Sequence, residues 1–221
     1  MAFFTKEYFA FFNQLEKNNN KVWFDAHRSE YEAFVKVPFR KFTEHIIAQL
    51  AKTDKSILTD ASKCIFRINK DVRFSKDKSP YKLNLAAVFG KNGKKDERPS
   101  FYVHIGNKEL FIGGGMYMIG KEDLQKIRQE IYYNPEEFEM VLKNKEFKKL
   151  YGKIAGEKNK VLPEDYREFA KEQPYIANKQ FYTGATLTQA DVLANDFDKK
   201  VLAHFKAVQP LNDFLNKALS Q

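Results

Sequence analysis

The segment SFYVHIGNKELFIGGGMYM, residues 100–118, sets the fold class of this chain. In its first half Tyr102 and His104 alternate with apolar residues, which is the period of a half-buried strand. The pair Gly106-Asn107 then predicts a turn, and the second half predicts another strand. We therefore expect two neighbouring strands, over residues 100–105 and 109–118.

Two further strands are expected upstream of this segment. Residues 83–89 form an apolar run, and a loop over residues 91–99 that contains Asn-Gly joins this run to the next strand. From Cys64 to Phe74 apolar and polar residues alternate again, which predicts a half-buried strand that bends near Asn69–Asp71. We expect its apolar side, including Phe74, to be buried. Its polar side consists of Arg67, Asn69, Asp71 and Arg73.

Helical spacing of apolar residues dominates both ends of the chain. Residues 5–53 predict three helices, which Asn18–Asn20 and Pro38 separate. After Gly120 we expect helices over 122–134 and 135–151, an irregular stretch over 152–166, a short helix over 166–172, a strand over 180–187, a helix from the Thr188–Asp191 capping box to about 208, and a closing helix from Pro210 to 219.

This order of helices, strands and helices is typical of an α+β fold. We expect a single domain over residues 1–221, with a mostly antiparallel or mixed sheet flanked by N- and C-terminal helices. Its parts are a helical region over 1–53, a strand cluster over 63–118, and a helical region with a late strand over 121–221.

The composition is that of a globular chain without covalent crosslinks. Its 221 residues are 43% hydrophobic, and a chain of this size buries roughly 70% of its unfolded surface. Cys64 is the one cysteine, which fits a reducing compartment, and the four histidines lack metal-ligand spacing. Neither a secretory signal nor an apolar stretch of roughly 18 residues is found. We expect a cytoplasmic protein with no metal and no membrane partner, and the sequence leaves the oligomeric state open.

Positive charge is concentrated in one segment. The net charge is +9, and between Lys63 and Lys95 ten Lys or Arg residues stand against two Asp. A localised field of this kind favours an anionic partner, either a small molecule or nucleic acid. For Lys91, Lys94 and Lys95 a solvated lysine-rich loop is the preferred interpretation.

The strongest candidate site lies in this segment. Two guanidiniums about a carboxylate can form a fork for a phosphate or carboxylate ligand, in which Asp71 orients an arginine or acts as a base. A structural ion-pair ladder is the alternative. The following loop, which Ser79-Pro80 turns, can present lysines and backbone N–H groups to an anion. The candidate ligand-binding residues of the segment are Arg67, Asn69, Arg73, Lys76, Lys78, Tyr81 and Lys82.

Four residues outside the segment are further candidates. His104 is a candidate general base if its strand face is that of Arg67, although a lone strand histidine is more often structural. Three consecutive glycines around Gly114 permit close approach of a ligand or of another backbone, and a bulge is the more common reason for them. Tyr117 follows them, and Arg128 flanks an apolar helical stripe, where a buried ion pair is its default role. Trp23 is expected in the core. No P-loop, His-Glu-x-x-His, nucleophile elbow or dinucleotide fingerprint occurs, so no cofactor is expected.

The stretch Arg67–Lys82 resembles the signature of a conserved hypothetical family, the domain of unknown function numbered twenty-four sixty-one. Other parts of the chain are similar to that family as well: Asn19-Asn20, Trp23-Phe24, Phe111–Tyr117, Ile127-Arg128 and Pro210-Leu211. At Asn69 the family often carries a second arginine. The resemblance implies an intracellular α+β domain with a site at this stretch, and it implies no reaction, metal or cofactor.

Two functions therefore stay open. The first is a binding module for a phosphorylated or carboxylate small molecule or for nucleic acid. The second is an enzyme acting on a phosphate- or carboxylate-bearing substrate, with Asp71 or His104 as acid or base. A third possibility is that the basic stretch stabilises the fold or a dimer.

Overall fold

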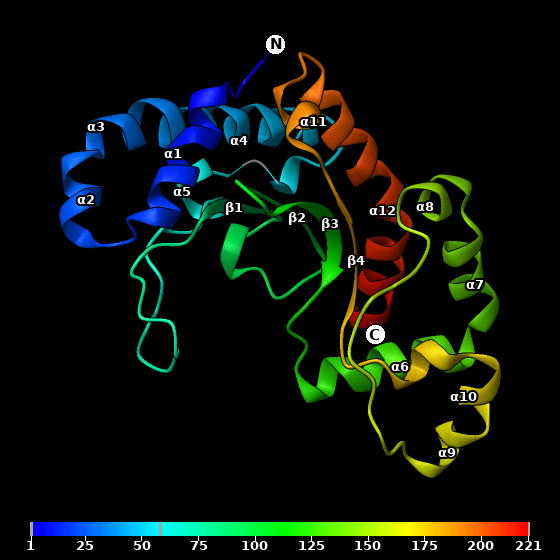
Figure 1. Cartoon of the computed structure of the whole chain (residues 1–221). Coiled ribbons are helices and arrows are strands. Elements are labelled where there is room, and N and C mark those ends of the chain that lie inside the picture. Colours follow the sequence, from blue (N-terminus) through cyan, green and yellow to red (C-terminus); the bar gives the residue numbers. More distant parts are fainter. Residues whose placement is uncertain (1, 58, 221) are drawn as a thin grey trace. The chain divides into compact units, whose positions relative to one another are not determined.

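One four-stranded antiparallel sheet organises the chain, and the α+β assignment is confirmed. The computed structural model describes residues 2–57 and 59–220, so Met1, Leu58 and Gln221 of the predicted domain lie outside the described residues. The strands follow one another in space as they do in sequence (Figure 1). They are β1 Asn84–Phe89, β2 Ser100–Gly106, β3 Leu110–Met116 and β4 Phe181–Thr186.

The helices agree with the regions predicted from the spacing of apolar residues. Before the sheet come α1 Lys6–Lys17, α2 Lys21–Ala26, α3 Arg28–Glu30, a π-helical segment Tyr31–Lys36, α4 Val37–Leu50 and α5 Ala61–Cys64. After β3 come α6 Lys121–Tyr133, α7 Pro135–Lys143, α8 Lys145–Leu150, α9 Glu164–Arg167 and α10 Phe169–Glu172, and after β4 come α11 Gln189–Leu193 and α12 Phe197–Leu219. None of the helices in the described ranges is long and apolar enough to cross a membrane.

The chain divides into two compact units. The first consists of Met1–Lys95, Tyr102–Ile112 and Thr186–Leu202, and the second of Asp96–Phe101, Gly113–Ala185 and Ala203–Gln221. That both belong to one folding domain stays a prediction.

Aromatic side chains from distant parts of the chain fill the core of the first unit. Phe4 contacts the rings of Tyr8 and Phe42 with centroids 4.9 and 5.4 Å apart, and Phe197 stacks on Phe42 at 5.3 Å. The hydroxyl of Tyr8 donates to the main-chain carbonyl of Ile105 in β2 at 2.9 Å. The buried phenol thus satisfies its polar atom while its ring contributes to the core.

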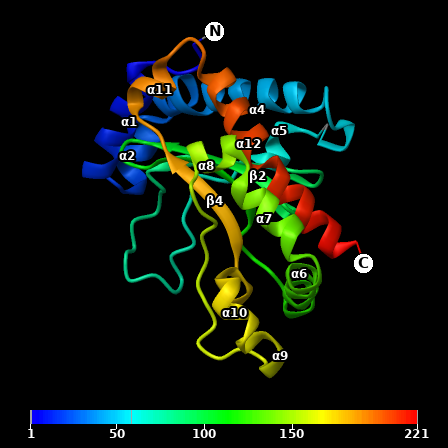
Figure 2. The same cartoon turned by 90° about the vertical axis from the view of Figure 1, so that its right-hand side faces the viewer.

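In the second unit the C-terminal half of α12 packs against Phe101 of β2 and against α7. Phe205 stacks on Phe101 of β2 at 4.6 Å, and Phe214 contacts Phe138 of α7 at 5.1 Å. Figure 2 shows α7 and α12 side by side. Lys217 of α12 also reaches Glu137 of α7 at 2.6 Å, so the two helices are joined by a ring contact and an ion pair.

The glycine triplet has a packing role. Gly115 has a φ of 110°, and a Cβ there would lie 2.2 Å from the carbonyl oxygen of Phe181 in β4. A Cβ on Gly113 would lie 2.0 Å from the oxygen of Thr183. Close approach of a second backbone, one of the three explanations considered for the triplet, is therefore what β3 and β4 show, although a bulge was the favoured explanation.

The prediction of a strand over residues 64–74 is wrong. Cys64 ends helix α5, and beyond it only isolated bridges form, between Ile65 and Ala87 and between Asn69 and Tyr81. On the side that was expected to be buried, Cys64 and Ile68 are buried and Phe66 and Val72 are half-buried, whereas Phe74 is 95% exposed. Side-chain bonds to the local backbone, such as the one from the amide of Arg73 to Asp71, take the place of a strand ladder beyond that point.

Three helix boundaries also differ from the prediction. Pro210 lies inside α12 and does not start a new helix, because buried residues on both sides of it, including Val208 and Leu211, hold the helix in place. The capping box of Thr188 and Asp191 is confirmed, but its helix ends at Leu193. The predicted helix over 135–151 is divided at Asn144, whose side chain caps α8. Trp23 is half-buried and stacks on His27 at 4.1 Å.

Candidate functional site

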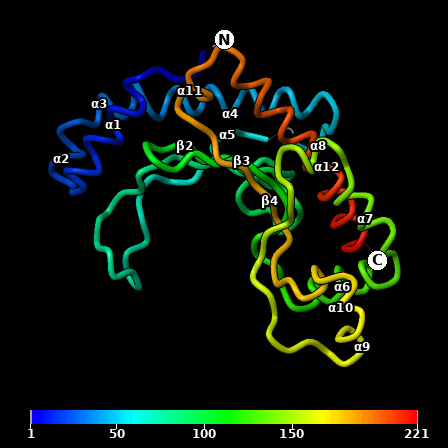
Figure 3. The backbone as a smooth tube through the Cα atoms, turned by 45° about the vertical axis from the view of Figure 1, so that its right-hand side comes forward, coloured from blue at the N-terminus to red at the C-terminus, as the bar shows by residue number. Residues whose placement is uncertain are grey.

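The candidate site is a loop that leaves the main body of the first unit and returns to it. We call residues 70–80 the basic loop. Its two ends are held together because Lys70 N donates to Pro80 O and Lys82 N donates to Ile68 O, both at 2.8 Å. Between these bonds the chain extends away from β1 and from the neighbouring helices (Figures 1 and 3). Residues that the sequence placed on a strand face therefore lie on a projecting hairpin-like loop.

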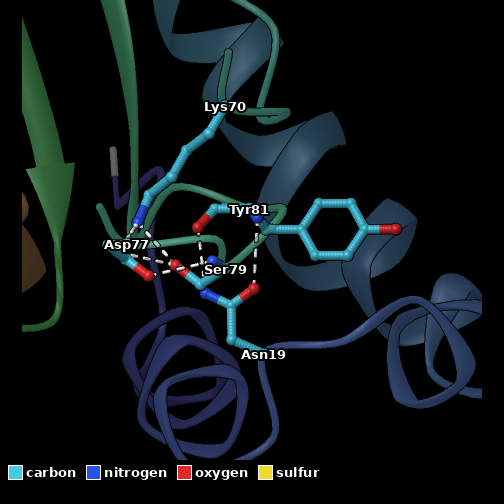
Figure 4. Close-up of polar contacts among 5 residues, drawn as sticks. All are labelled: Asn19, Lys70, Asp77, Ser79 and Tyr81. Atoms are coloured by element: carbon cyan, nitrogen blue, oxygen red, sulfur yellow. Dashed lines mark hydrogen bonds and ion pairs between the residues drawn. The ribbon is translucent and has the colours of Figure 1, made fainter. Parts of the chain in front are cut away.

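The base of the loop is fixed to the turn between α1 and α2. The side-chain amide of Asn19 donates to Tyr81 O at 2.9 Å, and its oxygen accepts from Tyr81 N at 3.1 Å (Figure 4). The Tyr81 ring is buried and stacks on Phe24 at 4.0 Å. Tyr81 thus serves as an anchor. Sequence reasoning treated Asn19 only as a helix breaker and a family mark.

A second polar cluster closes the neck of the loop. Lys70 Nζ contacts Asp77 Oδ2 at 2.6 Å and Ser79 Oγ at 2.7 Å, and Ser79 N donates to Asp77 Oδ1 at 2.9 Å (Figure 4). The hydrogen bond from Lys70 and those from Ser79 hold the pKa of Asp77 well below its usual range. The carboxylate is therefore charged at neutral pH and is occupied by the loop's own donors.

Asp71 and Arg73 form the predicted ion pair, but in solvent. Arg73 Nε and Nη2 donate to the two carboxylate oxygens at 3.0 and 2.7 Å. The Arg73 side chain is 76% exposed and that of Asp71 is 46% exposed. The guanidinium lowers the pKa of Asp71, so this carboxylate is a weak proton acceptor. A buried ion-pair ladder, the alternative considered from the sequence, is not what these two residues form.

The remaining cations surround the loop with differing freedom. Lys78 Nζ donates to Val72 O at 3.0 Å, and Lys82 Nζ donates to Arg67 O at 3.2 Å and lies 5.6 Å from the ring centroid of Phe66. Burial, followed by the charge of Arg67, lowers the pKa of Lys82. Within residues 2–57 and 59–220 the Arg67 and Lys76 side chains make no hydrogen bond or ion pair, and both residues are exposed. These two are available to a ligand.

Phe74 is the functional candidate that sequence reasoning missed. It was predicted to lie on the buried side of a strand, yet it is 95% exposed in the middle of the loop, with the guanidinium carbon of Arg73 5.8 Å from its ring centroid. An aromatic ring held in solvent between Arg73 and Lys76 is unusual, because burial would remove a large apolar area from water. The charged residues on either side of Phe74 in the sequence were the signal from which its exposure could have been predicted.

His104 lies on the sheet among aromatic rings. Its imidazole stacks on Phe111 at 5.5 Å, and its Nδ1 is 3.2 Å from the hydroxyl of Tyr102. Burial lowers its pKa, which keeps the ring neutral at pH 7. Among the described residues no hydrogen bond, ion pair or ring contact joins it to Arg67 or Asp71, so the structure does not bring together the two candidate acid–base groups.

The other candidates lie in the second unit, where each has a local contact. Gly114 is buried against Val208 of α12. Tyr117 is 65% exposed and contacts the edge of Tyr182. Arg128 is buried, and it donates to the carbonyl oxygens of Ile176 and Asn178 at 2.9 and 3.3 Å. Main-chain carbonyls thus take the place of the carboxylate partner that we expected for Arg128.

Asn69 is the remaining candidate residue, and Cys64 is the one cysteine of the chain. Asn69 is exposed and lies opposite Tyr81 in an isolated antiparallel bridge. Cys64 is buried, and burial raises the pKa of its thiol to about 11, which disfavours the reactive thiolate. Over the described ranges no three His, Cys, Asp or Glu side chains are grouped so that they could hold a metal ion.

The fold and the site define an α+β protein with a projecting basic loop whose base is anchored to its N-terminal helices. Residues 7–214 match the model of a protein family described as Conserved hypothetical protein (DUF2461), and the chain belongs to this family. The family resemblance noted in the sequence is thereby confirmed. No curated protein matches the chain.

Proposed function

We propose that this protein binds single-stranded nucleic acid through the basic loop. The observation that carries the proposal is the 95% exposure of Phe74 in the middle of a loop rich in cations. Proteins that bind single strands combine aromatic rings, on which bases stack, with positive charges that follow the phosphates. The basic loop offers both within a few residues.

The charges of the loop suit a polyanion. Arg67 and Lys76 are exposed, and among the described residues their side chains make no hydrogen bond or ion pair, while Arg73 can exchange its exposed contact with Asp71 for a phosphate. Exposed ion pairs contribute only about 0–1 kcal/mol, so this exchange meets little resistance. The carboxylate of Asp77 is already neutralised by Lys70, which leaves a loop of mainly positive field.

The exposure of the loop favours an extended ligand over a compact one. A small-molecule site typically encloses 70–90% of its ligand. Arg67, Arg73 and Phe74 instead project from an exposed segment. The alternative of an enzyme with Asp71 or His104 as acid or base lacks an observation in its favour, because Asp71 is paired with Arg73 and His104 is stacked on Phe111.

The test is a binding titration of the full chain with labelled oligonucleotides of about 12 nucleotides, a length within the range of single-strand sites. Fluorescence anisotropy is measured from about 50 to 200 mM salt with single- and double-stranded versions of the same sequence. We expect tighter binding of the single strand and a salt slope of roughly −2 to −3, as three or four phosphate contacts would give.

The control compares two variants that lose the same charge. Lys76→Gln with Lys78→Gln removes two cations from the basic loop, whereas Lys148→Gln with Lys149→Gln removes two exposed cations from α8. We expect only the first pair to weaken binding and to reduce the salt slope. Undetectable binding of the parent chain at low salt would remove nucleic acid and leave small anions as the partner.

A further inference from the structure

A second group of lysines lies outside the basic loop and lines a hollow of its own. The hollow has a volume of about 490 Å³ and lies between α5 and the loop that joins β1 to β2. We call it the lysine hollow. Its lining includes Lys63, Lys91, Lys94, Lys95 and Thr59, with no carboxylate among the lining residues.

The walls of the hollow are fixed by two contacts between distant segments. Lys94 Nζ donates to Ser62 O at 2.9 Å and to Ile65 O at 3.0 Å, which ties the β1–β2 loop to the end of α5. Gly93 has a φ of 59° and lies so close to α5 that a Cβ would be 2.5 Å from Lys63 O. The loop is therefore seated against the helix in a conformation that favours glycine.

Charge is the distinctive property of the lysine hollow. Lys63, Lys91 and Lys95 are exposed, and within the described part of the chain their ammonium groups have no hydrogen-bonded or ion-pair partner. The nearby carboxylate of Asp60 accepts from Ser62 N at 2.6 Å and caps α5. Several like charges around one concavity repel one another, and an anion in the concavity relieves that repulsion.

We propose that the lysine hollow is a binding site for a small molecule that carries several phosphate groups. Lysine is an established phosphate ligand because its ammonium group acts as a compact point charge with three donors. The three unpartnered groups, those of Lys63, Lys91 and Lys95, match a di- or triphosphate better than a single phosphate. The volume falls within the roughly 300–1,000 Å³ of small-ligand sites. This site is separate in its residues from the basic loop and does not depend on the function proposed for that loop.

The experiment is an isothermal titration of the full chain with inorganic tripolyphosphate at low salt, with orthophosphate as a second ligand. We expect one saturable site for tripolyphosphate and much weaker binding of orthophosphate. Lys63→Gln with Lys95→Gln should weaken tripolyphosphate binding by about tenfold or more, because two charge-assisted bonds are lost. Lys148→Gln with Lys149→Gln, which removes the same charge from α8, should change it by less than about twofold, because exposed charges that do not line the hollow are screened.

Three other outcomes would each overturn the proposal of a polyphosphate site in the lysine hollow. Equal losses in the two double variants would show a general effect of net charge, and absence of saturable binding in the parent would show that the hollow is a solvated surface. If a single-stranded oligonucleotide displaced tripolyphosphate from the parent, the hollow would belong to a nucleic-acid surface. Melting curves without ligand check the fold of each variant, and Lys91→Gln alone replaces the double variant if that variant melts lower than the parent.

Discussion

The side chain of Asn19 holds the main chain of Tyr81 from both sides, accepting from its N–H at 3.1 Å and donating to its carbonyl at 2.9 Å across 62 residues of sequence. An asparagine amide can make this pair of bonds because its donor and acceptor lie side by side, as they do in a peptide unit. The contact fixes the point at which the basic loop returns to β1.

Asn19→Ala should therefore destabilise the protein by about 1–3 kcal/mol, because it leaves two main-chain groups of a part-buried residue unpaired. Urea unfolding of the parent and the variant measures this difference. Asn18→Ala is the control, since Asn18 makes one exposed side-chain bond, to Gln14 O, and should cost less. Equal losses in the two variants would contradict the anchoring role of Asn19.

Phe74→Ala should weaken binding of a single-stranded oligonucleotide by about 1–3 kcal/mol, the contribution of one base stacked on an aromatic ring. Its stability should stay within about 0.5 kcal/mol of the parent because the ring is almost fully exposed. Anisotropy titrations measure the affinity. Tyr133→Ala, which removes another exposed ring, should leave the affinity unchanged, and Phe74→Tyr should retain most of it. Unchanged binding by Phe74→Ala would remove stacking from the proposed function.

Arg73→Ala separates a ligand contact from a structural ion pair. Both side chains of the ion pair between Arg73 and Asp71 are exposed. Loss of this pair should therefore change the free energy of unfolding by no more than about 1 kcal/mol. Binding of the anionic partner should fall by about 1.5–3 kcal/mol if one charge-assisted bond is lost. A melting curve and an oligonucleotide titration of the same sample give both quantities. A loss of stability of several kcal/mol with no change in binding would make Arg73 part of the scaffold.

Much of the fold was predictable because its signals are local. The alternation around Tyr102 and His104 and the turn at Gly106-Asn107 predict a hairpin whose boundaries agree closely with β2 and β3. The capping box of Thr188 and Asp191 is likewise a bond between near neighbours. Such patterns depend on residues within a few positions of one another, so no knowledge of the tertiary structure is needed.

The site was less predictable because it depends on partners far away in sequence. Alternation up to Phe74 has the period of a strand, but a strand also needs a partner, and the bridges end at Asn69. Nothing in the sequence around Asn19 indicates that its amide meets Tyr81. Arg128 was expected to meet a carboxylate, and only the folded chain shows that carbonyl oxygens accept its bonds.

The neck of the basic loop should respond to acid through Asp77. The hydrogen bonds from Lys70 and Ser79 lower the pKa of this group in the folded chain, so their stabilising effect is complete above its unfolded pKa of about 3.9 and is lost as the pH falls through the lower folded value. Lys70→Met should raise the pKa of Asp77 toward its ordinary value. An NMR titration that follows the Ser79 amide, which donates to Asp77 Oδ1, reports the midpoint in each protein. The same midpoint in both would show that Lys70 does not hold this carboxylate.

Gly115→Ala tests the close approach of β3 to β4. The residue has a φ of 110°, which L side chains rarely adopt, and its Cβ would lie 2.2 Å from a main-chain oxygen that cannot rotate away. We expect a loss of at least about 2 kcal/mol, from backbone strain of about 1–3 kcal/mol together with displacement of the neighbouring strand. Gly120→Ala is the matched control, because nothing lies within 4 Å of a Cβ at that position, and its effect should stay within about 1 kcal/mol. Chemical unfolding of the parent and of the two variants measures these losses of stability. If both changed stability equally, the close approach of β4 would not be what requires glycine at position 115.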